Sequence, residues 1–413
     1  MSDLTLAGPT LAEFQEARER VSKVAHVTPM ESSAFLSKVL GVPVFLKCEN
    51  LQRTGSYKIR GAYNRISRLD ADEKARGVVA ASAGNHAQGV ALAARELGIK
   101  ATIFMPVGVA LPKLQATRDY GADVVLSGHS VEDALRAASE FSESTGAVFI
   151  PPFDHPDVIA GQGTLGLEIL DQVPDVETIV VAIGGGGLIA GVASAITQVR
   201  AQVGRTIRVI GVQAANSAPY AVSMKLGALT SIVPTPTIAD GIAVSKPGVL
   251  NFAIVRDVVD EVVTVSDDDT ARAILVLLER AKQVVEPAGA VGVAAVLTEQ
   301  VRALGTTVIV LSGGNIDPLM MERVISRGLE ASDRYLHFRV MLPDRPGQLS
   351  RVSEIISEAN ANVVEVLHTR HGHGLQISEV ELELSVETRG PEHAEQVLEH
   401  LRSAGFTPVI VTA

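Results

Sequence analysis

The sequence predicts an α/β fold with mostly parallel sheets, followed by a smaller domain with an antiparallel sheet. Short apolar runs alternate with longer alanine-rich amphipathic stretches, and most of the runs are soon followed by Gly, Ser or Pro. Parallel strands have this composition because crossover helices cover both of their faces. A change of pattern after Ser332 predicts the second domain.

The predicted strands of the first part are runs rich in β-branched residues. They include Val44–Leu46, Val78–Ala80, Ala101–Met105, Asp123–Leu126, Ile179–Ile183, Arg208–Gln213 and Val308–Leu311. The predicted helices between them include Ala87–Leu97, Lys113–Tyr120, Val131–Thr145 and Thr270–Lys282. Gly98 and Gly121 follow two of these helices, where a left-handed residue commonly ends a helix. Alternating strands and helices imply right-handed crossovers, with ligand-binding loops at the carboxyl ends of the strands.

The second part has the order βαββαβ, which is the ferredoxin-like arrangement. Its predicted elements are Tyr335–Leu342, Leu349–Ala359, Asn362–Thr369, Leu375–Val386, His393–Ser403 and Pro408–Val411, with 371–374 between the two central strands. Apolar residues at 380, 382, 384 and 386 alternate with Glu381, Glu383 and Ser385, which predicts a sheet with one solvated face. We therefore predict a first domain over residues 1–328, with a smaller lobe at roughly 50–160, and a second over 329–413.

Composition excludes several classes of protein. Of the 413 residues, 46% are hydrophobic and 20% charged, which is typical of a folded globular chain. A net charge of −11 disfavours nucleic acid as a partner. The single cysteine, Cys48, cannot form an internal disulfide, so we expect a cytoplasmic protein. We expect no signal peptide, because the N-terminus lacks a basic region followed by an apolar stretch. We expect no membrane partner, because the apolar runs are too short to span a bilayer.

Lys58 lies in the run Thr54–Gly61, the lysine loop, between glycines and small hydroxylated residues. Such a backbone can bend tightly and hold the amine against a flat, anionic partner. A lysine amine that attacks a carbonyl group forms a Schiff base. The alternative is that Lys58 is one of many solvated surface charges. The other loops of the predicted sheet distinguish these two interpretations.

Three further loops follow predicted strands. The asparagine loop, Ala81–Gly89, opens a helix whose first amides suit a carboxylate, and Asn85 can hydrogen-bond a ring oxygen. In the glycine loop, Gly184–Leu188, the glycines let consecutive amides converge on a phosphate. This loop fits neither the P-loop nor the dinucleotide pattern, so the expected anion is a phosphate monoester. The serine loop, Ser312–Asn315, offers a neutral partner to a ring nitrogen, which suits elimination. Helix capping by Ser82, Asn85 or Ser312 and a tight turn at the glycines are the alternatives. Together the loops point to pyridoxal 5′-phosphate.

These segments resemble a known enzyme family. The run Lys47–Ala62 resembles the cofactor-lysine signature of the serine/threonine dehydratases, which are fold-type II pyridoxal-phosphate enzymes. The asparagine, glycine and serine loops and the segment Glu286–Ala290 match in the same order, over roughly residues 10–325. The resemblance implies a two-lobed catalytic domain like that of tryptophan synthase β. Asp344–Leu349 resembles the opening of an ACT domain, so the chain is similar to threonine ammonia-lyases with a single C-terminal ACT domain.

The resemblance also implies a role for each site residue. Lys58 would bind the cofactor covalently and then act as the base at Cα. The cofactor phosphate would lie at Gly184, Gly185, Gly186, Gly187 and Leu188, the ring oxygen at Asn85 and the ring nitrogen at Ser312. The substrate carboxylate would lie at Ser82, Ala83, Gly84, Asn85 and His86, although the side chain of His86 can simply pack under the loop. Glu286 would lie beside the ring.

Two departures from the family pattern narrow the reaction. Serine racemases of this family carry a serine just before the glycine of the asparagine loop, as the acid–base group on the second face. That position is Ala83 here, which favours dehydration over racemisation. Those relatives also bind a divalent metal through acidic residues after a central strand. The corresponding stretch Gly211–Ser217 has no carboxylate, so no metal site is expected.

The implied activity is dehydration and deamination of L-threonine to 2-oxobutyrate and ammonia, and of L-serine to pyruvate, feeding isoleucine biosynthesis. Two alternatives stay open: a serine or 3-hydroxyaspartate dehydratase of the same family, and a non-catalytic amino-acid sensor. The implied effector is isoleucine or valine, bound near Asp344–Leu349, where ACT domains pair. A homo-oligomer, dimer or tetramer, is also expected.

Overall fold

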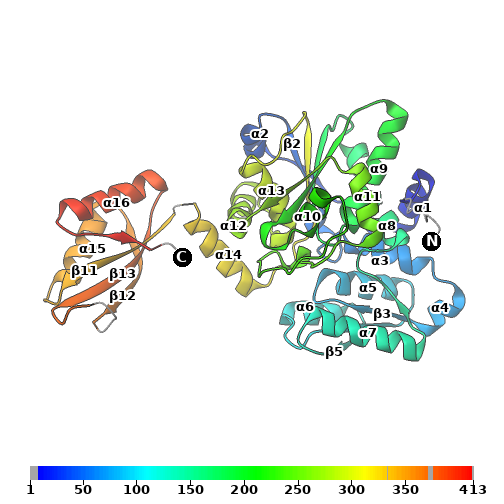
Figure 1. Cartoon of the computed structure of the whole chain (residues 1–413), viewed down its shortest axis with the longest axis horizontal. Helices are drawn as coiled ribbons and strands as arrows, with labels where there is room; N and C mark the ends of the chain where they lie inside the picture. The colour runs from blue at the N-terminus through cyan, green and yellow to red at the C-terminus, as the bar shows by residue number, and fades with distance from the viewer. Residues whose placement is uncertain (1–7, 333, 371–374, 412–413) are drawn as a thin grey trace. The chain divides into compact units, whose positions relative to one another are not determined.

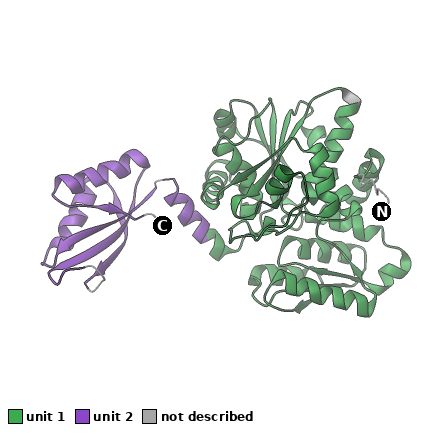
Figure 2. Ribbon diagram, in the orientation of Figure 1, with its two compact units in different colours: residues 1–321 green, residues 322–413 purple. Residues whose placement is uncertain are grey.

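The computed structural model describes residues 8–332, 334–370 and 375–411. The chain divides into two compact units, residues 1–321 and 322–413 (Figure 2). Helix α14 (Pro318–Glu330) contains this boundary as well as the predicted boundary between residues 328 and 329. Within the described residues, no helix is long and apolar enough to cross a membrane.

The larger lobe of the first unit is built on a six-stranded sheet. Its strand order is β1 (Met30–Ser32), β2 (Val44–Cys48), β10 (Thr307–Leu311), β7 (Thr178–Ala182), β8 (Arg208–Ala214), β9 (Glu261–Val265). All neighbours are parallel except β1 and β2. Helix α13 (Pro287–Leu297) packs on one face and α9 (Gly187–Val203) on the other (Figure 1). Further helices of this lobe are α1 (Leu11–Val21), α2 (Ala34–Leu40), α8 (Pro156–Gln172), α10 (Pro219–Leu226), α11 (Val249–Val258) and α12 (Asp267–Val276).

The smaller lobe is a four-stranded parallel sheet of order β5 (Asp123–Leu126), β4 (Ala101–Met105), β3 (Val78–Ala81), β6 (Val148–Phe149). Successive residues of β3 enter two different cores, as side-chain alternation along a strand requires. Val78 and Ala80 pack with α5 (Asn85–Glu96), and Val79 and Ala81 with α7 (Val131–Thr145). Helices α3 (Lys58–Ser67), α4 (Ala71–Arg76) and α6 (Leu111–Asp119) complete the lobe (Figure 1).

The predicted α/β class is confirmed, and three details differ from the prediction. Strands β1, β6 and β9 lie outside the predicted runs. Strand β5 is not buried on both faces: Asp123, Val125 and Leu126 are exposed, because β5 is an edge strand. The predicted helix Thr270–Lys282 is α12 followed by a π-helical turn, Leu277–Ala281. Positive φ angles of 68° at Gly98 and 89° at Gly121 agree with the predicted helix ends.

The second unit has the predicted βαββαβ order. It comprises β11 (Tyr335–Pro343), α15 (Gln348–Glu358), β12 (Asn362–Thr369), β13 (Glu379–Glu387), α16 (Pro391–Ser403) and β14 (Val409–Ile410). The antiparallel sheet has the order β12-β13-β11-β14, and Figure 1 shows α15 and α16 against it. Two details differ: β13 begins at Glu379 rather than Leu375, and Ser385 is buried. The stretch 371–374 lies outside the described residues.

Candidate active site

The lysine loop is fixed against the serine loop by backbone contacts. The amide of Tyr57 donates to the carbonyl oxygen of Ser312 at 3.2 Å, and Ser56 pairs with Gly313. Lys58 is the first residue of α3, so its side chain leaves the backbone at a helix start beside the carboxyl end of β10. The two segments are therefore adjacent, as the predicted sheet required.

The amine of Lys58 is the titratable group at the centre of this arrangement. Its Nζ donates to the carbonyl oxygen of Pro152 at 3.0 Å. Burial lowers the pKa of this amine to about 8, and the carboxylate of Glu286 opposes the shift. A lysine with its pKa in this range is available as a nucleophile or base near neutral pH. The surface alternative for Lys58 is therefore wrong.

Asn85 lies at the centre of a polar network that joins three loops. Its Nδ2 donates to Oε1 of Glu286 at 2.6 Å, and its Oδ1 accepts from Nδ2 of Asn315 at 2.8 Å. Gly313 lies against this network, because a Cβ there would be 2.2 Å from Oε1 of Glu286. The asparagine loop, the serine loop and the start of α13 thus converge on one place.

The asparagine loop presents backbone amides rather than side chains at the start of α5. The N-cap residue is Gly84, and no side chain caps the helix. The hydroxyl of Ser82 instead accepts a hydrogen bond from the amide of Gly84 at 3.1 Å. The predicted alternative of a helix-capping Ser82 or Asn85 is therefore wrong. The open amides of a helix start attract anions such as carboxylates.

The ring of His86 turns away from this role. Its Nε2 lies 2.9 Å from the carbonyl oxygen of Ile150, and the side chain is buried. Burial, together with the nearby charge of Lys58, lowers the pKa of the imidazole to about 3, so the ring is neutral at physiological pH. Only the backbone of His86 is placed to meet a substrate carboxylate.

Glu286 is a buried carboxyl group whose protonation is finely balanced. Burial raises its pKa to about 7, and the charge of Asp240 adds to this shift. Lys113, the Asn85 hydrogen bond and Lys58 act in the opposite direction. Near neutral pH this group therefore exists in both protonation states, beside the amine of Lys58 and the amide of Asn85.

The glycine loop connects β7 to α9, and its four glycines lie where there is almost no space for a side chain. A Cβ on Gly185 would lie 2.3 Å from the ring of Phe153, and one on Gly186 would lie 1.9 Å from Oη of Tyr220. Gly186 also has a φ of 96°, which L residues rarely adopt. The glycine loop is thus a structural tight turn, as the alternative predicted, but it also presents free backbone amides.

The backbone amides of the glycine loop are free of hydrogen-bond acceptors. Among the described residues, none accepts a hydrogen bond from the amides of the Gly184–Leu188 loop. The carbonyl oxygen of Gly185, in contrast, accepts from Oη of Tyr220 and from Nδ2 of Asn251, each at 3.0 Å. The peptide is thereby held so that consecutive amides of a helix start stay open. This geometry fits a phosphate monoester.

Pro152 and Phe153 connect the phosphate end to the lysine end of the site. The carbonyl of Pro152 contacts Nζ of Lys58, and the ring of Phe153 packs on the glycine loop. Ser312 is buried and directly follows β10, next to the lysine loop. An amine, a buried hydroxyl and a phosphate cradle around one place fit pyridoxal phosphate, which needs all three.

Sequence reasoning missed several residues that shape this site. They are Asn315, Pro152, Phe153, Tyr220 and Asn251. Asn315 belongs to the serine loop, and its position after two glycines was the available signal. Tyr220 and Asn251 donate side-chain hydrogen bonds to a backbone carbonyl, Pro152 acts through its own carbonyl and Phe153 through packing, and none of these contacts leaves a sequence motif. Among the described residues no group of three or more His, Cys, Asp or Glu is placed to hold a metal.

Comparison with known proteins places the chain in a family. Residues 21–313 match the pyridoxal-phosphate dependent enzymes, and residues 338–406 match the ACT domain. The chain belongs to the family of pyridoxal-phosphate dependent enzymes. An L-threonine ammonia-lyase of Geobacter sulfurreducens is 49% identical over 394 residues, which are 95% of this chain and 97% of that protein.

Two solved structures resemble this chain over most of its length. Maize serine racemase has a TM-score of 0.73 at 36% identity, covering 78% of this chain and 99% of that one. The processed form of threonine deaminase isoform 2 from Solanum lycopersicum has a TM-score of 0.72 at 37% identity, covering 78% and 94%. The predicted family, fold class, ACT domain and pyridoxal-phosphate cofactor are confirmed.

Proposed function

We propose that this enzyme dehydrates and deaminates L-threonine to 2-oxobutyrate and ammonia, and acts in the same way on L-serine. The observation that carries the proposal is the partly buried amine of Lys58, which lies between the open amides of two helix starts, those of α5 and α9. The similarity to an L-threonine ammonia-lyase over nearly the whole chain supports the choice of threonine.

Each part of the site has one task in this proposal. Pyridoxal phosphate, when bound, withdraws electrons from Cα of the amino-acid substrate. The amides of the glycine loop hold the phosphate, and those at the start of α5 hold the substrate carboxylate. Lys58 removes the proton from Cα, and its lowered pKa leaves enough neutral amine for this at neutral pH. Ser312, a neutral ring partner, suits loss of the β-hydroxyl.

Replacing Lys58 tests the assignment. Lys58→Ala removes the amine that binds the cofactor covalently, so we expect loss of the visible absorbance of the purified protein and loss of turnover. The control is Lys100→Ala, because Lys100 forms an ion pair with Asp123 at the surface of the small lobe. A Lys58→Ala protein that keeps both its absorbance and its turnover would refute the assignment.

The rival reactions belong to the same family. Serine or 3-hydroxyaspartate dehydratases would use the same groups, and the maize relative is a serine racemase. Ala83 carries no acid–base group for the second face of the substrate, which favours elimination over racemisation. Steady-state rates on L-threonine, L-serine and 3-hydroxyaspartate, with chiral analysis of the remaining serine, separate these reactions.

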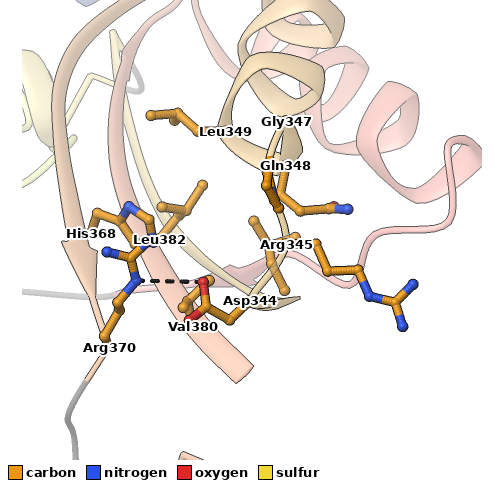
Figure 3. Close-up of a pocket in the computed structure, with 11 residues that line it drawn as sticks. Asp344, Arg345, Gly347, Gln348, Leu349, His368, Arg370, Val380 and Leu382 are labelled. Carbon is orange, nitrogen blue, oxygen red and sulfur yellow. Dashed lines mark hydrogen bonds and ion pairs between the residues drawn. The ribbon is translucent and has the colours of Figure 1, made fainter. Parts of the chain in front are cut away.

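For the ACT domain we propose regulation by isoleucine or valine, which also places the enzyme in isoleucine biosynthesis. A cavity of about 350 Å³ lies at the turn between β11 and α15 (Figure 3). Nε of Arg370 lies 3.4 Å from Oδ1 of Asp344. These opposite charges suit the carboxylate and the ammonium group of an amino acid. No side chain caps α15, so its first amides are open to a carboxylate. Leu342, Leu349 and Val380 line the cavity and suit a branched side chain.

Calorimetry on the full-length enzyme tests this proposal. We expect isoleucine or valine to bind the wild type, and Asp344→Asn to weaken binding by about tenfold, since a charged hydrogen bond contributes about 1.5 kcal/mol. Glu358→Gln, at the other end of α15, is the matched control. Absence of binding heat in the wild type, with kinetics insensitive to both amino acids, would contradict it. We also propose that the enzyme is a cytoplasmic homo-oligomer, either a dimer or a tetramer.

A further inference from the structure

An ion pair joins the two lobes of the catalytic unit at the edge of the site. Nζ of Lys113, on α6 of the small lobe, lies 3.1 Å from Oδ2 of Asp240, on the short 3-10 helix Asp240–Ile242 of the large lobe. The two residues are 127 positions apart in the sequence.

Both ends of this pair touch elements of the candidate site. A Cβ on Gly84 would lie 3.7 Å from Nζ of Lys113, so the lysine lies against the asparagine loop. A Cβ on Gly241 would lie 3.8 Å from Oε1 of Glu286 and 3.0 Å from Cβ of Ala288. Lys113 therefore contacts the loop that is proposed to bind the substrate carboxylate, and the Asp240 helix packs beside Glu286.

The segment that carries Asp240 is irregular but anchored. Between α10 and α11 the chain forms a long connection in which Asp240–Ile242 is the only helical turn described. Oγ1 of Thr237 donates to Oδ1 of Asp267 at 2.6 Å, and the amide of Ile238 donates to its Oδ2 at 3.0 Å. Long irregular connections in compact domains commonly serve a functional site. These bonds fix the segment just before Asp240.

We propose that Lys113 and Asp240 form a latch that holds the asparagine loop of the small lobe over the large lobe and balances the charge around Glu286. Both are positioning residues, because they act through Gly84 and Glu286. Their catalytic effect rests on the proposed function, whereas the mechanical effect does not.

The exposure of the pair suits a latch that opens in each cycle. The side chain of Lys113 is 16% exposed and that of Asp240 is 65% exposed. Ion pairs with this degree of exposure change an equilibrium by only about 1.5- to fivefold. The lobes can thus separate readily to admit a substrate and close again.

The Lys113–Asp240 pair does more than join the lobes mechanically, because its two charges act in opposite directions on the protonation of Glu286. The charged and polar groups that act on Glu286 are Asp240, Lys113 and Lys58, with Asn85 as its hydrogen-bond donor. Asp240 favours the protonated carboxyl group, and Lys113 favours the ionised one. Removal of either partner breaks the latch, but the two removals shift the protonation of Glu286 in opposite directions.

Hydrogen–deuterium exchange of the holoenzyme tests the mechanical part. We expect Lys113→Met and Asp240→Asn each to raise exchange about two- to fivefold in peptides covering α6 and residues 229–247. The double variant Lys113→Asp with Asp240→Lys restores the wild-type rates. Lys100→Met, which breaks the exposed 3.2 Å pair with Asp123 inside the small lobe, leaves these peptides unchanged. Wild-type exchange in both single variants would overturn the latch.

The pH profile of kcat/KM for L-threonine tests the charge balance. Ionisation of Glu286 should produce one limb of this profile. Lys113→Met is expected to move that limb to higher pH, and Asp240→Asn to move it to lower pH. Shifts in the same direction, or none, would overturn this part. Because exchange needs no turnover, an inactive protein with latch-dependent exchange would refute the proposed function and leave the latch intact.

Discussion

Burial sets the protonation of the two titratable groups that lie nearest to the proposed ring position. The pKa of Lys58 falls to about 8 and that of Glu286 rises to about 7, with desolvation as the largest cause of both shifts. Burial disfavours the charged form of each group, so the pKa of the amine falls and the pKa of the carboxyl group rises until both lie near physiological pH. Such pairs are typical of sites that transfer protons at physiological pH.

Glu286→Gln should remove one component of the pH dependence of stability. The folded-state pKa of about 7 lies above the ordinary carboxyl value of 4.5, so the folded state keeps a proton that the unfolded state has lost. The contribution of Glu286 to stability is therefore present at low pH and is lost as pH rises from about 4.5 to about 7. It amounts to about 3 kcal/mol.

Calorimetry of the apoprotein at pH 5, 6, 7 and 8 checks this prediction. The melting temperature of wild type minus that of Glu286→Gln should fall across this range, because all other titrating groups are shared. A constant difference would show that Glu286 is ionised throughout.

At the scale of elements, a buried charge network anchors the helix that begins at Lys58. Arg60 contacts Glu49 and Glu168, each at 2.8 Å, and Lys47 contacts Glu168 at 2.8 Å. The side chains of Arg60, Glu49 and Lys47 are fully buried. The network ties α3 to the end of β2 and to α8, which fixes the origin of the Lys58 side chain.

Arg60→Leu should destabilise the apoprotein by about 3–5 kcal/mol, because it leaves two buried carboxylates with one cation between them. Arg136→Leu is the control: Arg136 forms a 2.7 Å pair with Asp133, but its side chain is 67% exposed, so the loss should stay below about 1 kcal/mol. Urea unfolding measures both. Equal losses in the two variants would contradict the anchoring role.

The turn into α9 offers a second test at this scale. Gly186→Ala places a methyl group against Tyr220 at a φ of 96°, so the cradle must shift and affinity for pyridoxal phosphate should fall by at least about tenfold. Gly227→Ala is the matched control, since its φ is 66° but nothing lies within 4 Å of the added methyl. Cofactor titration of the two apoproteins separates loss of the cradle from backbone strain. Equal affinities would contradict the assignment.

At the scale of the whole molecule, local patterns predicted most elements and all four loops. Runs such as Ala101–Met105 and the alternation along β13 carry enough apolar residues to mark a strand. The two residues of β6 and the three of β1 are too few to show a period. Strand β5 has a buried-strand composition, yet it lies at an edge, which depends on sheet order rather than on local sequence.

The candidate site shows the same division. Glycines, a lysine and a serine in motif positions could be found from spacing alone. Contacts between distant side chains could not: Phe153 on Gly185 and Asp240 with Lys113 follow from how the two lobes close on each other. Such contacts belong to tertiary packing, and no local pattern encodes them.

Deamination of threonine by means of Lys58 can be measured as the initial rate of 2-oxobutyrate and ammonia release from L-threonine by the purified wild type. L-serine and 3-hydroxyaspartate are assayed in parallel. We expect equimolar 2-oxobutyrate and ammonia, with kcat/KM highest for L-threonine. Turnover of 3-hydroxyaspartate alone, or release of neither product from L-threonine, would contradict it.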